Sequence, residues 1–378
     1  MSDGEGQKYF KRNVIDQWIT VGRLMIGRRS PRVLESTPVR PSYSSVMVTQ
    51  NCNYKCVMCS FWHARTTDEL SLEEVSGLLR DMRRVGIRQV NFTGGEPLLR
   101  DDLVDIISAA RREAFEMIQV TTNGSLATEK RLESLVDAGV RRIAISCDGV
   151  GVHHDTQRGV PGAWGKNIAA LDALRAIRSA RAEKIEIELA MVLSKITAGD
   201  LKDLLRVAED YDAVVHLQFL DDVQYFTTSA EFGEQMLSPE EVDRLMDEIH
   251  AHIDGSPAMD PFLTHEGIEY ARSYLKRQER ANAPPPSCGV GYAMVYVDSR
   301  GNVFPGCFAV APLGNVREQP LHEIIGSPRH CEVAQDLMRM NCPRCPNGYA
   351  WGVFTNPGAM AREVARRTRR KLQVLRAG

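Results

Sequence analysis

The sequence predicts an α/β fold in which parallel strands are covered by helices. The main observation is an alternation: between residues 45 and 220, short apolar stretches typical of strands are followed by longer stretches with apolar residues at helical spacing. Strands that are joined through helices run parallel in their sheet. The second observation is size, because 378 residues of which 43% are apolar can bury one large barrel-type domain and a smaller second domain.

The repeating part of the chain is expected to contain six strands separated by helices. The strands are predicted at residues 45–48, 89–93, 117–121, 142–146, 186–192 and 214–219, and the helices at 72–85, 102–112, 129–138, 163–178 and 201–208. In barrels and open sheets of this kind, the chemistry gathers at the carboxyl ends of the strands. The motifs described below each follow one of the predicted strands.

The flanking segments differ from this pattern. In residues 1–44 we expect a helix lying across the main domain, because Trp18, Ile19 and Leu24 share one of its sides; attachment to a membrane surface is the alternative. Residues 221–287 form a linker and helical segment, with a helix at about 239–254 and a proline run at 284–286. A second module is expected at 288–350, followed by a basic C-terminal helix at 351–378.

Composition excludes several classes of protein. A net charge of −2 does not suggest a polyanion-binding protein. No stretch approaches 18 uninterrupted apolar residues, and the N-terminus lacks the apolar core of a signal peptide. We therefore expect a cytoplasmic protein with neither nucleic acid nor a membrane as a partner. In that reducing compartment, nine cysteines favour metal ligation over disulfides.

Three cysteines follow the first predicted strand at Cys-x3-Cys-x2-Cys spacing: Cys52, Cys56 and Cys59. Three thiolates can hold three irons of a four-iron cubane and leave the fourth iron without a protein ligand. A metal centre with an open position usually performs chemistry. The alternative is a zinc knuckle or unrelated buried thiols, but no nearby residue completes a four-ligand zinc site.

The next strands are followed by further turn motifs. Gly94-Gly95-Glu96-Pro97 follows the second strand, Thr122-Asn123-Gly124 the third and Ser146-Cys147-Asp148-Gly149 the fourth. Together with the cysteine triad, this set resembles the radical S-adenosylmethionine (radical SAM) enzymes, which have a six-stranded partial (β/α)6 barrel. The resemblance implies a [4Fe-4S] cluster on the three thiolates, whose open iron binds S-adenosylmethionine (SAM) and passes it the electron that releases a 5'-deoxyadenosyl radical.

The resemblance also implies which residues contact SAM. At the second turn, Gly94 and Gly95 allow backbone carbonyls to approach the ammonium group, Glu96 offers a counter-charge and Pro97 stiffens the turn. Arg158, in the segment His154-Asp155-x-x-Arg158-Gly159, is expected to pair with the methionine carboxylate; a surface arginine near a helix start is the alternative.

Other expected cofactor contacts come from the remaining strand ends. Asn123, Ser146 and Asp148 are candidates to bind the ribose or the carboxylate, although each could instead satisfy its own turn. Met58, at a place often held by an aromatic residue in relatives, is expected to lie against adenine. Cys147 has the opposite strand parity from Ser146 and Asp148, so we expect it to point away from the barrel interior as a packing residue.

The second module carries four further cysteines: Cys288, Cys307, Cys342 and Cys345. A hairpin is predicted at 294–297 and 302–305, and four thiolates close a site for either zinc or an iron–sulfur cluster. After a radical SAM barrel, this arrangement resembles the twitch version of the SPASM domain and implies one auxiliary [4Fe-4S] cluster. The spacing between Gly301 and Cys307 is one residue longer than usual. Cys331 is spare: a core cysteine, a substitute ligand or, in an epimerase, a hydrogen donor.

The expected reaction follows from the closed second site. A fully ligated auxiliary cluster has no open iron for substrate, which favours a role in accepting an electron and hence an oxidoreductase of dehydrogenase type. The resemblance to aminocyclitol-pathway enzymes implies a small hydroxyl-rich substrate (sugar, aminocyclitol, aminoglycoside or nucleoside) in antibiotic biosynthesis. Epimerisation, dehydration and decarboxylation are alternative outcomes.

Two other function classes remain open at this stage. A peptide-modifying maturase is one alternative, although the 44 residues before the first strand are too few for a leader-binding domain. A non-catalytic iron–sulfur or zinc protein is the other. Substrate-pocket candidates at the last barrel strand are Gln218, Asp221, Asp222 and Tyr225. A flavodoxin or ferredoxin is the electron donor that the resemblance implies.

Overall fold

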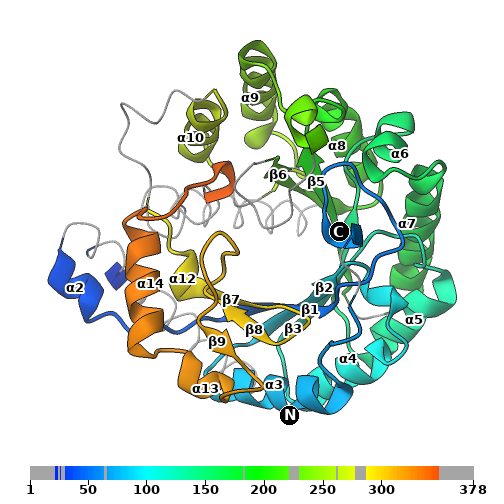
Figure 1. The fold of residues 1–378 in the computed structure, drawn as a ribbon. Helices are drawn as coiled ribbons and strands as arrows, with labels where there is room; N and C mark the ends of the chain where they lie inside the picture. The colour runs from blue at the N-terminus through cyan, green and yellow to red at the C-terminus, as the bar shows by residue number, and fades with distance from the viewer. Residues whose placement is uncertain are drawn as a thin grey trace, which may run out of the picture.

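The computed structural model describes residues 22, 23, 26, 30–63, 66–181, 184–220, 230–260, 263–276 and 287–348. In this part of the chain the strands form one nine-stranded sheet of order β6-β5-β4-β3-β2-β1-β7-β8-β9. The sheet is curved, and helices lie along its outer side (Figure 1). The expected α/β fold with an open, partial barrel is therefore confirmed.

The six strands of the barrel are parallel neighbours in chain order. They are β1 (Tyr43–Thr49), β2 (Gln89–Gly94), β3 (Met117–Thr122), β4 (Arg142–Ser146), β5 (Glu186–Leu193) and β6 (Ala213–Phe219). The helices between them are α3 (Leu72–Arg84), α4 (Leu103–Arg112), α5 (Glu129–Ala138), α6 (Val152–Arg158), α7 (Ala163–Ala180) and α8 (Leu201–Asp210). Every predicted strand is present, with ends displaced by at most two residues.

Alternation along the strands explains why helices cover only one face. In β5 the burial pattern is strictly alternating: Ile187, Leu189, Met191 and Leu193 are buried, whereas the residues between them keep accessible surface. The buried set packs with apolar residues of the outer helices in one continuous core. The opposite, inner face of the sheet consequently carries the side chains that are not used for packing.

Helix α6 was not predicted, although it carries Arg158. It is only seven residues long, begins after Gly151 and ends at Gly159, which has a left-handed φ of 65°. Such a short segment has too few apolar positions for helical periodicity to be recognised. Its existence depends instead on its contacts with the cysteine loop described below.

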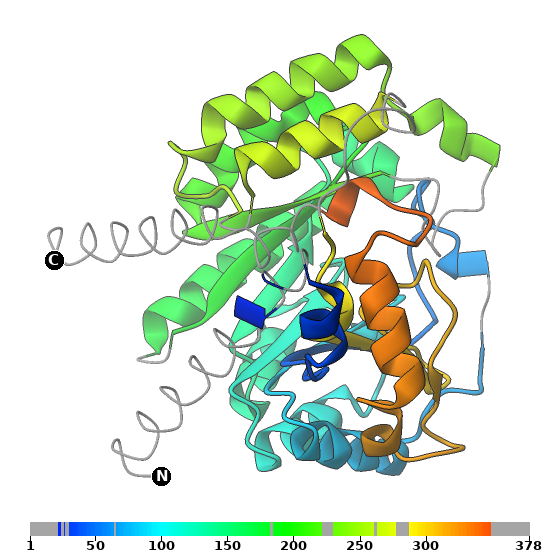
Figure 2. The same cartoon turned by 90° about the vertical axis from the view of Figure 1, so that its left-hand side faces the viewer.

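Helices α9 (Pro239–Ile253) and α10 (His265–Leu275) pack side by side beyond β6 (Figure 2). Helix α9 was predicted, and it begins with a capping box in which Ser238 and Glu241 satisfy each other's backbone N–H groups. A bridge between Val215 and Met259 ties the segment after α9 to β6. This bridge places Asp260 beside the inner face of the sheet.

The second module continues the sheet of the barrel. Strand β7 (Met294–Val297) pairs in parallel with β1, and β8 (Asn302–Phe304) and β9 (Gly314–Asn315) extend it antiparallel. The predicted hairpin is thus present, and the longer Gly301 to Cys307 spacing leaves its pairing intact. The module also contains α12 (Val290–Ala293), α13 (Leu321–Ile324) and α14 (Pro328–Met338), with α2 (Pro31–Glu35) packed against α14.

Several predicted segments lie outside the described residues. They are most of the N-terminal extension, the proline run at 284–286 and the C-terminal helix at 351–378. Among the described residues, no helix has both the length and the apolar character needed to cross a membrane.

Candidate functional site

The loop that carries Cys52, Cys56 and Cys59 is held on one side by the turn after β2. The backbone N–H of Gly95 donates to the carbonyl of Thr49 at 2.9 Å. A Cβ on Gly95 would lie 2.2 Å from the carbonyl oxygen of Asn51, so no larger residue fits there. The structure therefore explains Gly95 by its close packing against the cysteine loop, and the expected approach of carbonyls to an ammonium group stays a prediction.

Glu96 connects the two neighbouring turns. Its side chain is fully buried and accepts hydrogen bonds from the N–H of Leu98 (3.0 Å), the hydroxyl of Thr122 (2.7 Å) and the N–H of Asn123 (2.7 Å). Burial raises the pKa of Glu96, and these donors oppose the rise. We predicted a counter-charge facing the cofactor. The carboxylate has no accessible surface and joins the two turns in this structure, and its role as a counter-charge to the cofactor stays a prediction.

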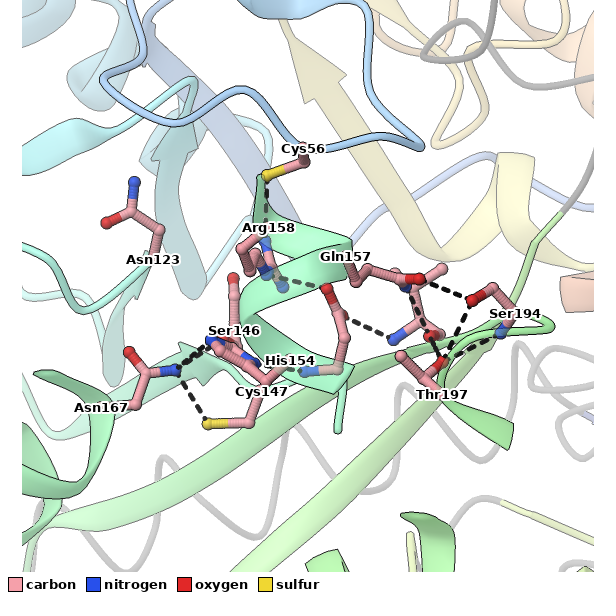
Figure 3. Close-up of polar contacts among 12 residues, drawn as sticks. Cys56, Asn123, Ser146, Cys147, His154, Gln157, Arg158, Asn167, Ser194 and Thr197 are labelled. Atoms are coloured by element: carbon pink, nitrogen blue, oxygen red, sulfur yellow. Dashed lines mark hydrogen bonds and ion pairs between the residues drawn. The ribbon is translucent and has the colours of Figure 1, made fainter. Parts of the chain in front are cut away.

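Helix α6 supports the cysteine loop from the other side (Figure 3). The N–H of Val57 donates to the carbonyl of Gln157 at 3.0 Å. A Cβ on Gly159 would lie 2.3 Å from the carbonyl oxygen of Lys55, which explains the glycine at this helix end. Arg158, the residue between them, directs its guanidinium to the Cys56 thiol at 3.8 Å. The arginine is therefore part of the site and not a surface residue.

Arg158 is also paired with Asp148. The Nε to Oδ2 distance is 2.8 Å, and the two side chains are 9% and 0% exposed. Burial acts to lower the pKa of Arg158, but the charge of Asp148 and the neighbouring Cys56 and Cys147 thiols together outweigh it, so the pKa is raised and the guanidinium stays cationic. We predicted Asp148 as a possible cofactor contact. Asp148 is fully buried, accepts a hydrogen bond from the N–H of Val192 (2.9 Å) and orients Arg158, and its contact with the cofactor stays a prediction.

A neutral histidine, His154, supports the pair of Arg158 and Asp148. His154 is fully buried, and burial lowers its pKa to about 3. Its Nδ1 therefore accepts a hydrogen bond, at 3.2 Å, from the backbone N–H of Asp148. Gln157 adds a second support, because its amide donates to the carbonyl of Val192 and accepts from Ser194 (Figure 3). The network fixes where the Arg158 guanidinium points.

The other predicted cofactor residues lie around the same edge of the sheet. The Asn123 amide donates to Asn53 at 2.9 Å and approaches the Cys52 sulfur at 3.9 Å, so it contacts the cysteine loop. Met58 is buried in an apolar cluster with Tyr54, Cys56, Ala163 and Leu220. The cofactor contacts predicted for Asn123, Ser146, Met58, Gly94 and Pro97 stay predictions.

Cys147 faces away from this site, as its strand parity predicts. Its thiol is fully buried in the core and accepts a hydrogen bond from the Asn167 amide of α7 at 3.2 Å (Figure 3). The same amide donates to the carbonyl of Ser146 at 2.9 Å. Cys147 therefore contributes to packing between β4 and α7.

The three loop thiols form a donor set that suits an iron–sulfur cluster. Burial raises the pKa of Cys56 to about 12, and Arg158 opposes this rise. The thiols of Cys52 and Cys59 lie close enough to interact electrostatically with Cys56. In the part of the chain that the structure describes, no three His, Cys, Asp or Glu side chains are grouped to hold a single metal ion. A cubane does not need such a group, because each thiolate ligates a different iron.

The four cysteines of the second module also come together. Cys288, Cys307 and Cys342 belong to one apolar cluster, which includes Tyr43 and Tyr296. Cys345 lies near Tyr296 as well, where burial and the neighbouring thiol groups raise the pKa of the phenol. The predicted set of four is therefore consistent with one site on the inner face of β1 and β7.

Cys331 is excluded from this set by its position. It packs against a separate cluster that contains Leu34, Val39, Tyr292, Ala334 and Met338. Its thiol approaches the carbonyl of Gly326, in the turn before α14, at 3.6 Å. The interpretation as a core cysteine fits this placement, and the interpretation as a substitute ligand does not.

The structure reveals polar residues on the inner face that we did not predict as site residues. Arg142, Glu188 and His216 project from β4, β5 and β6, and Asp260 binds His216 from the segment after α9. We call these four residues the inner-face band. Their alternation with buried apolar residues was visible in the sequence, but nothing there showed that the strands bring them together. Of our own substrate candidates, Gln218 is exposed near the end of β6, and Asp221, Asp222 and Tyr225 lie outside the described residues.

Two family models match the chain: the radical SAM superfamily over residues 46–208 and the SPASM iron–sulfur cluster-binding domain over residues 288–346. The chain therefore carries a radical SAM domain followed by a SPASM domain. The matched ranges cover the cysteine triad and the four cysteines of the second module. Together, the two domains imply a [4Fe-4S] cluster, an auxiliary cluster and SAM, as the cysteine spacing predicted.

Curated relatives of this radical SAM protein differ in their activities. An AdoMet-dependent heme synthase of Methanosarcina barkeri is 27% identical over 290 residues, which cover 73% of this chain and 80% of that protein. A GTP 3',8-cyclase of Listeria monocytogenes is 32% identical over 188 residues, or 47% of this chain and 53% of that protein.

Solved structures share the fold. Streptococcus suis SuiB bound to S-adenosylmethionine has a TM-score of 0.60 and 15% identity, covering 78% of this chain and 68% of that chain. The enzyme anSMEcpe with bound AdoMet and a peptide has a TM-score of 0.60 and 16% identity, covering 89% of this chain and 100% of that chain.

The geometry of this chain fits those groups. Cys52, Cys56 and Cys59 would hold the first cluster, and Cys288, Cys307, Cys342 and Cys345 the auxiliary one. The positive charge of Arg158 beside Cys56 suits an anionic cluster or the carboxylate of SAM. The site is thus that of a radical SAM enzyme.

Proposed function

We propose that this radical SAM enzyme oxidises a small hydroxyl-rich substrate, such as a sugar, aminocyclitol, aminoglycoside or nucleoside, in antibiotic or related natural-product biosynthesis. When bound, the first cluster and SAM supply a 5'-deoxyadenosyl radical that abstracts hydrogen. The residues of the chain hold the substrate and accept, as a proton, the second hydrogen that the substrate loses. Epimerisation, dehydration and decarboxylation are the other outcomes that the same radical permits.

One observation carries the proposal: the auxiliary cysteines and the inner-face band meet at two tyrosines. Tyr296 lies near Cys288, Cys307 and Cys345, and Tyr43 lies near both Tyr296 and Glu188. A substrate held by the band is therefore close to the four-cysteine site. Proximity to a closed, fully ligated site favours removal of an electron from the substrate radical, which is an oxidation.

The inner face also offers groups for proton transfer. Burial raises the pKa of Glu188, opposed by the nearby His216 and Arg142. A carboxylate with a raised pKa is a better proton acceptor than an exposed one. In the proposed reaction, the substrate hydroxyl would give its proton to such a group while its carbon is oxidised. A flavodoxin or ferredoxin is the electron donor that we propose.

A second candidate function comes from the relatives named AdoMet-dependent heme synthase, since they match over three quarters or more of their length. Under this alternative, the substrate would be a heme precursor. The peptide-maturation alternative is supported by the shared fold of SuiB, whose structure with its precursor peptide has a TM-score of 0.59. The inner-face band distinguishes these candidates by charge, as developed below.

The radical chemistry is tested by anaerobic reconstitution. With SAM and dithionite, we expect formation of 5'-deoxyadenosine by the reconstituted enzyme. The matched control is the Cys52→Ala/Cys56→Ala/Cys59→Ala variant, in which this product should be lost while auxiliary iron remains. Absence of 5'-deoxyadenosine from the unchanged enzyme would contradict the proposal.

The auxiliary site is tested by iron and sulfide counts. We expect about eight irons in the full enzyme and about four in the Cys342→Ala/Cys345→Ala variant, because each site holds one cubane. A variant that retains all its iron would show that these residues are not ligands. The substrate class is tested by incubation with sugars, aminocyclitols and iron coproporphyrin, with product mass as the readout.

A further inference from the structure

Glu188 is the carboxylate of the inner-face band that has no bonded partner in the part of the chain that the structure describes. It projects from the middle of β5, deep in the protein, and still keeps accessible surface. Among the described residues, no hydrogen bond and no ion pair involves its side chain. A deep carboxylate without a donor is costly unless a ligand or water completes it.

The neighbouring cations are already committed to other carboxylates. His216 pairs through Nδ1 with Asp260 at 2.7 Å, and Asp260 is almost fully buried. Arg142 binds Glu186 with two N–H groups, at 2.9 and 2.7 Å. Both cations influence the charge of Glu188, but neither donates to it.

The inner face of the sheet therefore carries a net negative charge. Strands β1 to β7 place Arg142, His216, Glu186 and Glu188 on it, and the adjoining segment adds Asp260. Even with His216 protonated, three carboxylates face two cations. Such a surface repels phosphates and carboxylates and attracts ammonium groups.

We propose that the substrate carries an ammonium group that pairs with Glu188, which makes the substrate class an amine-bearing polyol. This inference rests on the proposed function and adds the charge of the substrate to it. Asp260 is a positioning residue: it holds the His216 imidazolium away from Glu188, so that the carboxylate stays open to the ligand. The substrate would then lie between the triad and the four-cysteine site.

The test is a binding measurement on the anaerobically reconstituted full chain with SAM. Calorimetry compares 2-deoxystreptamine, a cyclitol diamine, with the neutral scyllo-inositol and with GTP as an anionic probe. We expect the diamine to bind at least about tenfold more tightly than the inositol, because one charge-assisted hydrogen bond accounts for a difference of this size. GTP should not bind, because the negative face repels its phosphates.

Variants assign the preference to its residue. Glu188→Gln should remove the preference for the diamine, whereas Glu133→Gln, which removes the same charge from the exposed side of α5, should leave it unchanged. Equal binding of diamine and inositol, no binding of the diamine, tighter binding of GTP, or an unchanged preference in Glu188→Gln would each overturn the inference. Formation of 5'-deoxyadenosine, measured separately with dithionite, shows whether the radical chemistry itself fails.

Discussion

Replacing Asp260 by Asn should lower the pKa of His216. In the native protein, burial acts to lower that pKa, but Asp260, 2.7 Å away, and then Glu188 raise it to about 9. The Asn side chain keeps the shape of the site and removes the charge. Burial, the largest influence on this pKa, then outweighs the remaining effect of Glu188, and we expect the pKa to fall to the ordinary value of about 6.5 or lower.

The same pair should make stability depend on pH. A rise from 6.5 to about 9 corresponds to about 3 kcal/mol at ~1.4 kcal/mol per unit. Since 33% of the His216 side chain is exposed, we expect a contribution of about 1–2 kcal/mol. Because the folded-state pKa is raised, this stabilisation is complete below pH 6.5 and is lost as the pH rises through about 9.

Two measurements test the prediction. NMR of 13C-labelled histidine side chains follows the titration of His216, with its signal assigned from a His216→Gln variant, and urea unfolding between pH 6.5 and 9.5 follows stability. Asp254→Asn is the matched control, because Asp254 pairs with the exposed His265 at 2.8 Å and should matter little. If His216 titrates alike in Asp260→Asn and in the unchanged protein, the reasoning is refuted.

Three further predictions concern the cluster regions. Gly95→Ala should reduce 5'-deoxyadenosine formation by about tenfold or more, because its Cβ would displace the cysteine loop 2.2 Å away; Gly77→Ala, in the open middle of α3, should leave activity unchanged and slightly raise stability. Asp148→Asn should lower the free energy of unfolding in urea by about 3–5 kcal/mol, since it leaves Arg158 buried without its partner. The control Asp203→Asn, in an exposed ion pair, should lower it by less than about 1 kcal/mol. Equal effects of the two variants would contradict the value expected for Asp148→Asn. Cys331→Ala should retain the full iron content, and a loss of about four irons would identify Cys331 as a ligand.

Local sequence patterns were sufficient for the fold. The barrel strands alternate or are continuously apolar, and the helices between them have strong caps, as at Ser71 and Thr128. These signals lie within a few residues of each other, so they survive without tertiary information. Short elements such as α6 could not be predicted from local signals, because their stability comes from contacts with other segments.

Two of the motif residues have protein neighbours that the sequence did not indicate. Glu96 and Asp148 were expected to face the cofactor because they follow strands whose ends meet at the site. In the structure both are fully buried: Glu96 bonds the next turn and Asp148 pairs with Arg158. The position of a carboxylate in the sequence indicates which edge of the sheet it occupies, but not which hydrogen-bond donor it contacts there.

The sequence by itself determined the alternation of strands and helices, the spacing of the cysteine triad and the motifs at the strand ends, because each depends on residues close together in the chain. Only the tertiary structure decided that β7 extends the barrel sheet, that Cys331 lies apart from the four auxiliary cysteines, and that Glu188 lies near His216, Asp260 and Tyr43. These neighbours come from distant segments, and strand register and sheet curvature bring them together.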